Sequence, residues 1–95
     1  MTLNDEQLEK VQELSSALLP PAEIAILLEL PADDRELFVD MCRNHQYSDV
    51  YAAYHRGRLQ TKYELRKTVI KLAKAGSPAA GPLVDGYIKE QITKE

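Results

Sequence analysis

The chain has 95 residues, a formal net charge of −3 and a hydrophobic fraction of 44%, so it can build an apolar core and is not a disordered segment. A single cysteine excludes an internal disulfide, and no apolar run approaches the ~20 residues that span a membrane. The first residues are acidic where a secretory signal would be basic, so we expect a cytoplasmic protein.

The first predicted element is an acidic helix within residues 1–20. Asn4 and Gln7 have the spacing of a capping box, and apolar residues follow at helical intervals. Two prolines end this helix and begin a second one over about residues 21–29, because proline fits the first helical turn. The second helix is apolar on all sides, which predicts a central place in the core.

Two further helices are expected in the middle of the chain. Pro31 interrupts the chain, and a third helix then runs to about Asn44 with an apolar stripe along one side. Ser48 has the position of the next helix cap, and a short fourth helix follows over about residues 49–56. Gly57 is expected to end it, since glycine is common at the C-terminal ends of helices.

The last part of the chain predicts a helical hairpin. Thr61 and Glu64 form the strongest capping box in the sequence and predict the start of a fifth helix, which ends before Gly76. The last helix begins near Ser77 or only at Pro82. Each helix has an apolar stripe that is expected to be buried: Leu65, Val69, Leu72 and Ala73 in the fifth, and Leu83, Tyr87, Ile88 and Ile92 in the last.

These elements predict an all-α protein, since no segment alternates as a strand does. We expect a single compact orthogonal bundle of five to six short helices that resembles a helix-turn-helix domain. Within one domain over residues 1–95, residues 1–20 would form the acidic helix, 21–60 the helix-turn-helix-like part and 61–92 the C-terminal hairpin.

Charge is unevenly distributed along the chain. Residues 55–74 contain seven Lys and Arg and one acid, a net of +6, whereas residues 1–40 contain ten acids and two bases, a net of −8. A basic tract can neutralise phosphates and release their counterions, which predicts an interface with double-stranded DNA. The candidate DNA-binding residues are Arg56, Arg58, Lys62, Arg66, Lys67, Lys71, Tyr54 and His55.

Each of these assignments has an ordinary structural alternative. Lys67, Lys71 and Lys74 can equally form a solvated helix face, and the tyrosines can be half-buried with their hydroxyls in water. A helix-turn-helix with residues 34–43 as the recognition helix would turn carboxylates toward phosphates, so the helix after Ser48 is the better candidate. A plain pair of packed helices explains the same pattern without any ligand.

No catalytic or metal-binding pattern is present. Cys42, His45 and His55 match no zinc signature, and the sequence has no glycine-rich phosphate loop and no nucleophile motif. We therefore expect no enzyme, no metal, no cofactor and no small-molecule substrate. Cys42 is expected to be a small buried apolar residue.

Several short runs resemble a family of small phage proteins. The runs AYHRG at 53–57, ELR at 64–66 and LAKAGSPAA at 72–80 are similar to those of small terminase subunits and related prophage helix-turn-helix proteins. EIAILL at 23–28 resembles the opening of many helix-turn-helix segments, so the resemblance covers roughly residues 21–88.

The resemblance implies recognition of viral DNA and assembly into a ring that hands DNA to a packaging motor. It would carry DNA contacts onto Arg56, Arg58, Lys62 and Arg66. The chain is short for a separate oligomerisation domain, and the helix around Asp34 is acidic, and both features depart from the family pattern.

Two functional hypotheses follow from these patterns. The first is a non-catalytic DNA-binding adaptor of phage or mobile-element type, as in DNA packaging. The alternative is a protein–protein interaction or structural assembly module, in which the acidic end of one copy meets the basic tract of another. The expected partners are therefore double-stranded DNA, another protein or a second copy, with no membrane.

Overall fold

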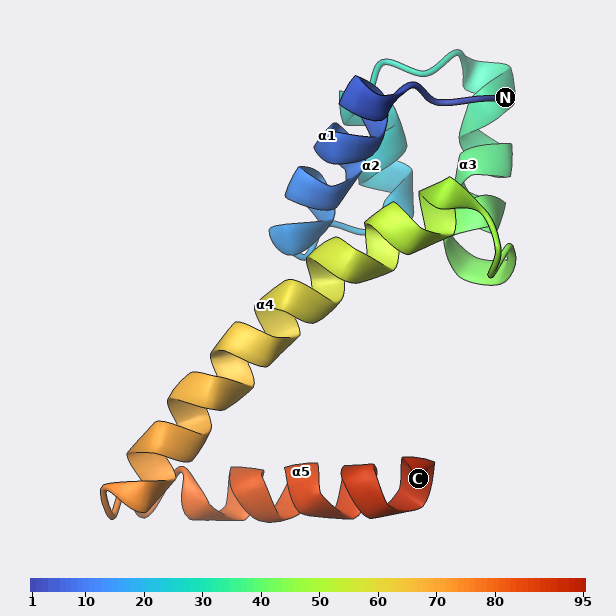
Figure 1. The fold of residues 1–95 in the computed structure, drawn as a ribbon. Helices are drawn as coiled ribbons and strands as arrows, with labels where there is room; N and C mark the ends of the chain where they lie inside the picture. Colours follow the sequence, from blue (N-terminus) through green and yellow to red (C-terminus); the bar gives the residue numbers. More distant parts are fainter. The chain divides into compact units, whose positions relative to one another are not determined.

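The computed structural model describes residues 1–95 and contains five α-helices and no strands (Figure 1). They are α1 (Asp5–Ser16), α2 (Pro21–Leu27), α3 (Ala32–Asn44), α4 (Asp49–Lys74) and α5 (Gly81–Lys94). The expected all-α class is confirmed. The contacts separate the chain into unit 1, Met1–Thr61, and unit 2, Lys62–Glu95. This boundary lies beside the predicted start of the C-terminal hairpin, and the single-domain organisation stays a prediction.

The N-terminal cap of α1 is formed as the sequence predicts. Asn4 Oδ1 accepts the Gln7 backbone N–H at 2.8 Å, and Gln7 Oε1 accepts the Asn4 backbone N–H at 2.9 Å. Pro21 is the first residue of α2, and Ser48 Oγ accepts the Tyr51 backbone N–H at 3.1 Å ahead of α4. The caps at Asn4 and Ser48 satisfy backbone donors that have no partner inside the helix.

The core of unit 1 collects one face from each of its helices. Val11 from α1, Ile24 from α2, and Phe38 and Cys42 from α3 are completely buried. The predicted place of α2 in the core holds for one side of the helix, where Ile24 and Ala25 are completely buried, but not for the other, where Ile26 and Leu27 are 56% and 54% exposed. The two helices that pack against this seven-residue helix cover only one of its sides.

The two predicted helices over residues 49–75 are one helix of 26 residues. Gly57 does not end a helix but lies inside α4, where it faces α1. A Cβ added there would lie 2.0 Å from Ser15 Oγ and 2.2 Å from the Gln12 carbonyl oxygen. Thr61 does not cap a helix either, because its hydroxyl donates to the Ser16 carbonyl oxygen at the end of α1. Both residues signal a close helix crossing rather than a break.

Unit 2 contains the C-terminal part of α4, a turn and α5. Gly76 has φ +93°, and it and Ser77 donate to the carbonyls of Ala73 and Leu72, each at 3.0 Å, as in a Schellman motif. The predicted helix end at Gly76 is thus confirmed, and of the two predicted starts for the last helix the later one is correct. In Figure 1, α5 leaves this turn at an angle to the unit 2 part of α4.

The predicted burial of the apolar stripes in unit 2 is wrong. The only buried residue of this unit is Ala80. Five large aliphatic side chains are between 50% and 66% exposed: Leu65, Leu72, Leu83, Ile88 and Ile92. The helices diverge from their turn, so their apolar stripes do not meet along their length.

Candidate protein and nucleic-acid interfaces

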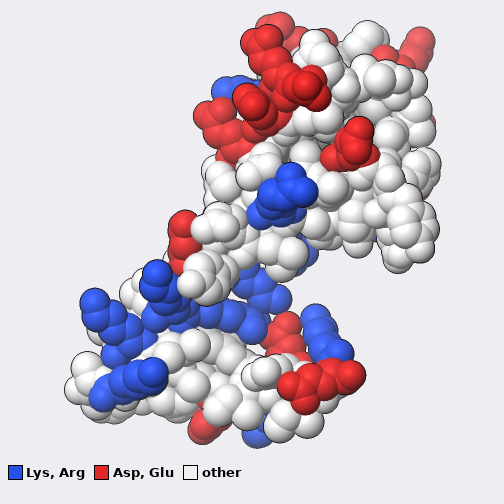
Figure 2. Space-filling view, in the orientation of Figure 1, with Lys and Arg blue, Asp and Glu red and all other residues white.

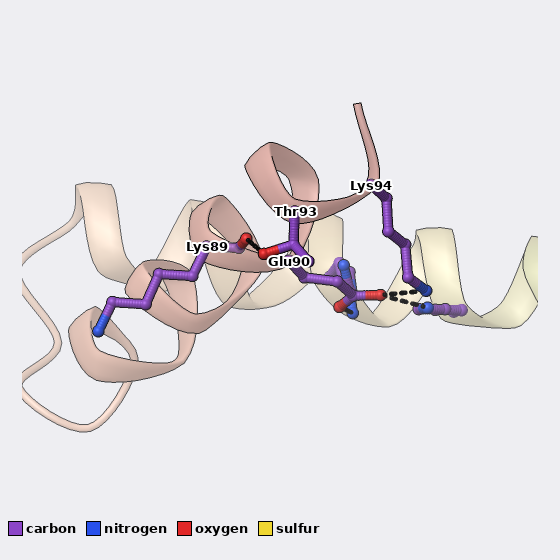
Figure 3. Close-up of polar contacts among 6 residues, drawn as sticks. Lys89, Glu90, Thr93 and Lys94 are labelled. Carbon is purple, nitrogen blue, oxygen red and sulfur yellow. Dashed lines mark hydrogen bonds and ion pairs between the residues drawn. The ribbon is translucent and has the colours of Figure 1, made fainter.

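Two of the candidate DNA contacts are ion-paired within unit 2. Glu90 of α5 pairs with Lys62 Nζ at 3.2 Å, with Arg66 of α4, and with Lys94 Nζ at 3.3 Å (Figure 3). The hydrogen bond from Arg66, followed by those from Lys62 and Lys94, lowers the pKa of Glu90 to about 2. The Arg66 guanidinium also lies 4.2 Å from the centroid of the Tyr87 ring. Lys62 and Arg66 therefore connect α4 to α5.

His55 and Tyr54 belong to the packing of unit 1. His55 Nε2 lies 3.0 Å from the Cys42 carbonyl oxygen, and since a carbonyl only accepts, this nitrogen donates the hydrogen bond. The His55 ring lies tilted against Tyr51, with the ring centroids 4.0 Å apart, and meets Tyr54 edge-on at 5.0 Å. Tyr54 packs against the core. These contacts fix α4 against the end of α3, which gives both rings a structural role and fits the half-buried alternative for Tyr54.

Arg56 and Arg58 are exposed and form no ion pair. Both lie inside α4, where the sequence predicted the end of a helix. At about 100° per residue, two positions apart on one helix point to nearly opposite sides. Arg56 lines a groove with Asp5, Glu9 and Asp49. Carboxylates beside a guanidinium repel a phosphate, so Arg56 is poorly placed for DNA.

Lys67, Lys71 and Lys74 line a groove between α4 and α5, which we call the basic groove. Its volume is about 710 Å³, and most of its lining surface is apolar. The lining contains no carboxylate. It consists of Tyr63, Arg66, Lys67, Ile70, Lys71, Lys74, Val84, Tyr87, Ile88 and Gln91. Lys67 Nζ lies 5.7 Å from the Tyr63 ring centroid, and none of the three lysines forms an ion pair. Figure 2 shows basic side chains gathered over unit 2.

Unit 1 has a groove of the opposite charge, which we call the acidic groove. It lies between α1 and α2 and has a volume of about 580 Å³. Glu6, Glu9 and Glu13 line it beside Leu27 and Leu28, together with Asn4, Gln7 and Lys10. Its single cation pairs with Glu13 at 3.6 Å. Figure 2 shows acidic side chains gathered on one side of unit 1.

The sequence predicted the lysines of the basic groove but not the apolar side chains that line it with them. Ile88 was expected in a buried stripe, because amphipathic spacing usually indicates core, and Ile70 was given no place at all. In the sequence, the acidic groove is indicated only by the excess of acidic residues over positions 1–40. The signal that could have found it is the spacing of Glu6, Glu9 and Glu13, which places all three on one side of a helix.

The remaining chemistry-bearing residues form no site. Cys42 is completely buried, as predicted, and burial raises the pKa of its thiol to about 12. No three His, Cys, Asp or Glu side chains come together in an arrangement that could hold a metal ion. None of the five helices combines the length and the apolar character that crossing a membrane requires.

Comparisons with protein families, with curated proteins and with solved structures found no match to this chain. The resemblance to small terminase subunits therefore stays a prediction that rests on the runs at 53–57, 64–66 and 72–80.

Proposed function

We propose that this chain is a non-catalytic protein–protein interaction module that assembles with copies of itself through unit 2. The observation that carries the proposal is the apolar surface of this unit. Its five large aliphatic side chains are half or more exposed, and Ala80 alone is buried. A pair of helices without a core of its own gains little from folding, so a surface on another molecule has to supply the burial.

The size of this surface fits an association. Covering a half-exposed Leu or Ile is worth ~1 kcal/mol, so a contact that covers two or three of these side chains gains ~2–3 kcal/mol from one side. The partner's own apolar side chains add to this figure. Association costs roughly 4–15 kcal/mol in lost freedom, so the two sides together reach the range in which a specific complex forms.

The test is the molecular mass of the purified chain, measured by sedimentation equilibrium over a wide range of concentration. We expect a mass above that of one chain, and dissociation on dilution. Ile88→Glu should weaken the association, because Ile88 is 50% exposed on unit 2 and lines the basic groove. Tyr47→Glu is the matched control, since Tyr47 is fully exposed on unit 1. A mass of one chain at every concentration would refute the proposal.

A second candidate function is DNA binding, as an adaptor of phage or mobile-element type. It is supported by Lys67, Lys71 and Lys74, which are exposed and have no carboxylate partner. Duplex binding should weaken with salt, and Lys67→Ala with Lys71→Ala should lower the slope of log K against log salt by about 2, at ~0.9 per phosphate contact. Lys89→Ala is the control. Arg56→Ala with Arg58→Ala tests the other candidate pair.

The two candidates separate in one titration. An association that is unchanged by added duplex, together with no binding of unrelated duplexes at low salt, supports the interaction module alone. Binding of duplex with unchanged affinity and salt slope in both double variants would remove these residues as phosphate contacts.

A further inference from the structure

We infer that the basic groove of one copy receives the acidic groove of a second copy, in a head-to-tail contact between unit 2 and unit 1. This inference rests on the proposed self-assembly and names the surfaces that carry it. The two grooves are the charged surfaces of the chain that also contain exposed apolar side chains.

Net charge favours this pairing over a symmetric one. Unit 1 has eleven acids and five bases, a net of −6, whereas unit 2 has seven bases and four acids, a net of +3. Two copies of unit 2 that met through their grooves would bring Lys67, Lys71 and Lys74 of one copy against the same lysines of the other. Like charges in one contact disfavour it, and opposite charges select the partner.

The charged rows also match in length. The first and last of Glu6, Glu9 and Glu13 are seven residues apart along α1, and the first and last of Lys67, Lys71 and Lys74 are seven residues apart along α4. At 1.5 Å per residue, each row is about 10 Å long, and its three members lie within one side of the helix. Two such rows, aligned side by side, place each ammonium group next to a carboxylate.

Apolar side chains accompany the charges on both surfaces. The lining of the basic groove contains Ile70, Val84 and Ile88. The lining of the acidic groove contains Leu27, which is more than half exposed, and Leu28. Exposed ion pairs contribute little affinity by themselves, so the apolar side chains would hold the contact and the charges would set its orientation.

A contact between two different surfaces leaves one of each unused at the ends of a dimer. Further copies can therefore add, and the assembly closes as a ring or continues as a filament. Screening of exposed charges by salt should weaken it, whereas a purely apolar contact between copies of unit 2 would not weaken in this way.

The test is a charge exchange between the two surfaces. One variant has Lys67→Glu with Lys71→Glu, and the other has Glu9→Lys with Glu13→Lys. We expect each variant alone to dissociate at about tenfold or higher concentration than the natural chain, and an equimolar mixture to regain association. The mixture regains it because the reversed groove of each variant again meets a surface of opposite charge.

Matched controls separate the position of a charge from the net charge. Lys89→Glu with Arg43→Glu changes the net charge as the first variant does, and Lys89 points away from the Glu90 cluster (Figure 3). Glu36→Lys with Glu95→Lys matches the second variant, and all four control residues are exposed outside both grooves. These controls should associate within about twofold of the natural chain, and circular dichroism confirms that every variant keeps its helices.

The outcomes distinguish this inference from the function on which it rests. A natural chain that stays single at every concentration removes the proposed self-assembly and the inference with it. Association that is unaffected by the Glu9 and Glu13 exchange, or a mixture that does not recover, overturns only the head-to-tail contact. Loss of association in the controls as well would show a net-charge effect and overturn it too.

Discussion

Replacement of Gly57 by alanine tests the close crossing of α1 and α4 in unit 1. The added Cβ would lie 2.2 Å from the Gln12 carbonyl oxygen and 2.0 Å from Ser15 Oγ. The Ser15 side chain can rotate, but the carbonyl belongs to the backbone of α1. Because real contacts of Cβ are essentially never closer than 3.0 Å, the helices have to separate by nearly an ångström.

Two opposing effects determine the free energy of unfolding of this variant. Alanine is a better helix former than glycine by ~1 kcal/mol, which stabilises α4. Overpacking of a close contact costs roughly 1–3 kcal/mol, and separation of the helices also opens the core around the fully buried Val11. Since the obstructing atom is backbone, we take the upper part of this range and expect a net loss of about 1–2 kcal/mol.

The assay is urea unfolding of the whole chain, followed by circular dichroism. With a slope of roughly 1 kcal/mol per molar urea for a chain of this size, the midpoint of Gly57→Ala should fall by about 1–2 M. Gly86→Ala in α5 is the matched control, because nothing lies within 4 Å of its added Cβ. It should raise the midpoint by up to about 1 M. A rise in Gly57→Ala of the same size would refute the close crossing.

Two titratable groups give further expected results. Hydrogen bonds hold the pKa of Glu90 at about 2, below its ordinary 4.5, so its contribution to unit 2 should be complete above pH 4.5 and be lost as the pH falls toward 2. Glu90→Gln should lack this dependence in an NMR titration of α5, and a carboxyl midpoint near 4.5 in the natural chain would contradict the cluster. Cys42, with a pKa of about 12 instead of 9.0, should react with a thiol reagent at pH 8 about a thousandfold more slowly than in urea. Fast modification of the native chain would contradict its burial.

Local signals predicted the parts of the fold that depend on neighbouring residues. The capping box at Asn4, the proline at the start of α2 and the left-handed glycine after α4 act within a few residues, so the sequence alone locates them. Glycine is common at helix ends and threonine at helix caps, so Gly57 and Thr61 falsely indicate a break between two helices. Their partners are on α1, more than forty positions earlier, and no local pattern contains that information.

The same limit applies to the burial of the apolar stripes. Leu72 and Ile88 are spaced as core residues are, and helical spacing indicates that a side is apolar without indicating what covers it. In unit 1 a second and a third helix cover such a side, and Ile24 and Phe38 are completely buried. In unit 2 the helices diverge, and the stripe becomes a surface.

The count of charges along the chain overstates what is available to a phosphate backbone. Of the seven cations between residues 55 and 74, Lys62 and Arg66 pair with Glu90, which lies more than twenty positions further on. Arg56 shares its groove with three carboxylates. Lys67, Lys71 and Lys74 have neither an ion pair nor a carboxylate in their groove, and the lining of that groove is mostly apolar. This surface combines free ammonium groups with an exposed isoleucine. A partner with carboxylates and apolar side chains can pair with both, whereas a sugar–phosphate backbone has no apolar side chains to cover the isoleucine.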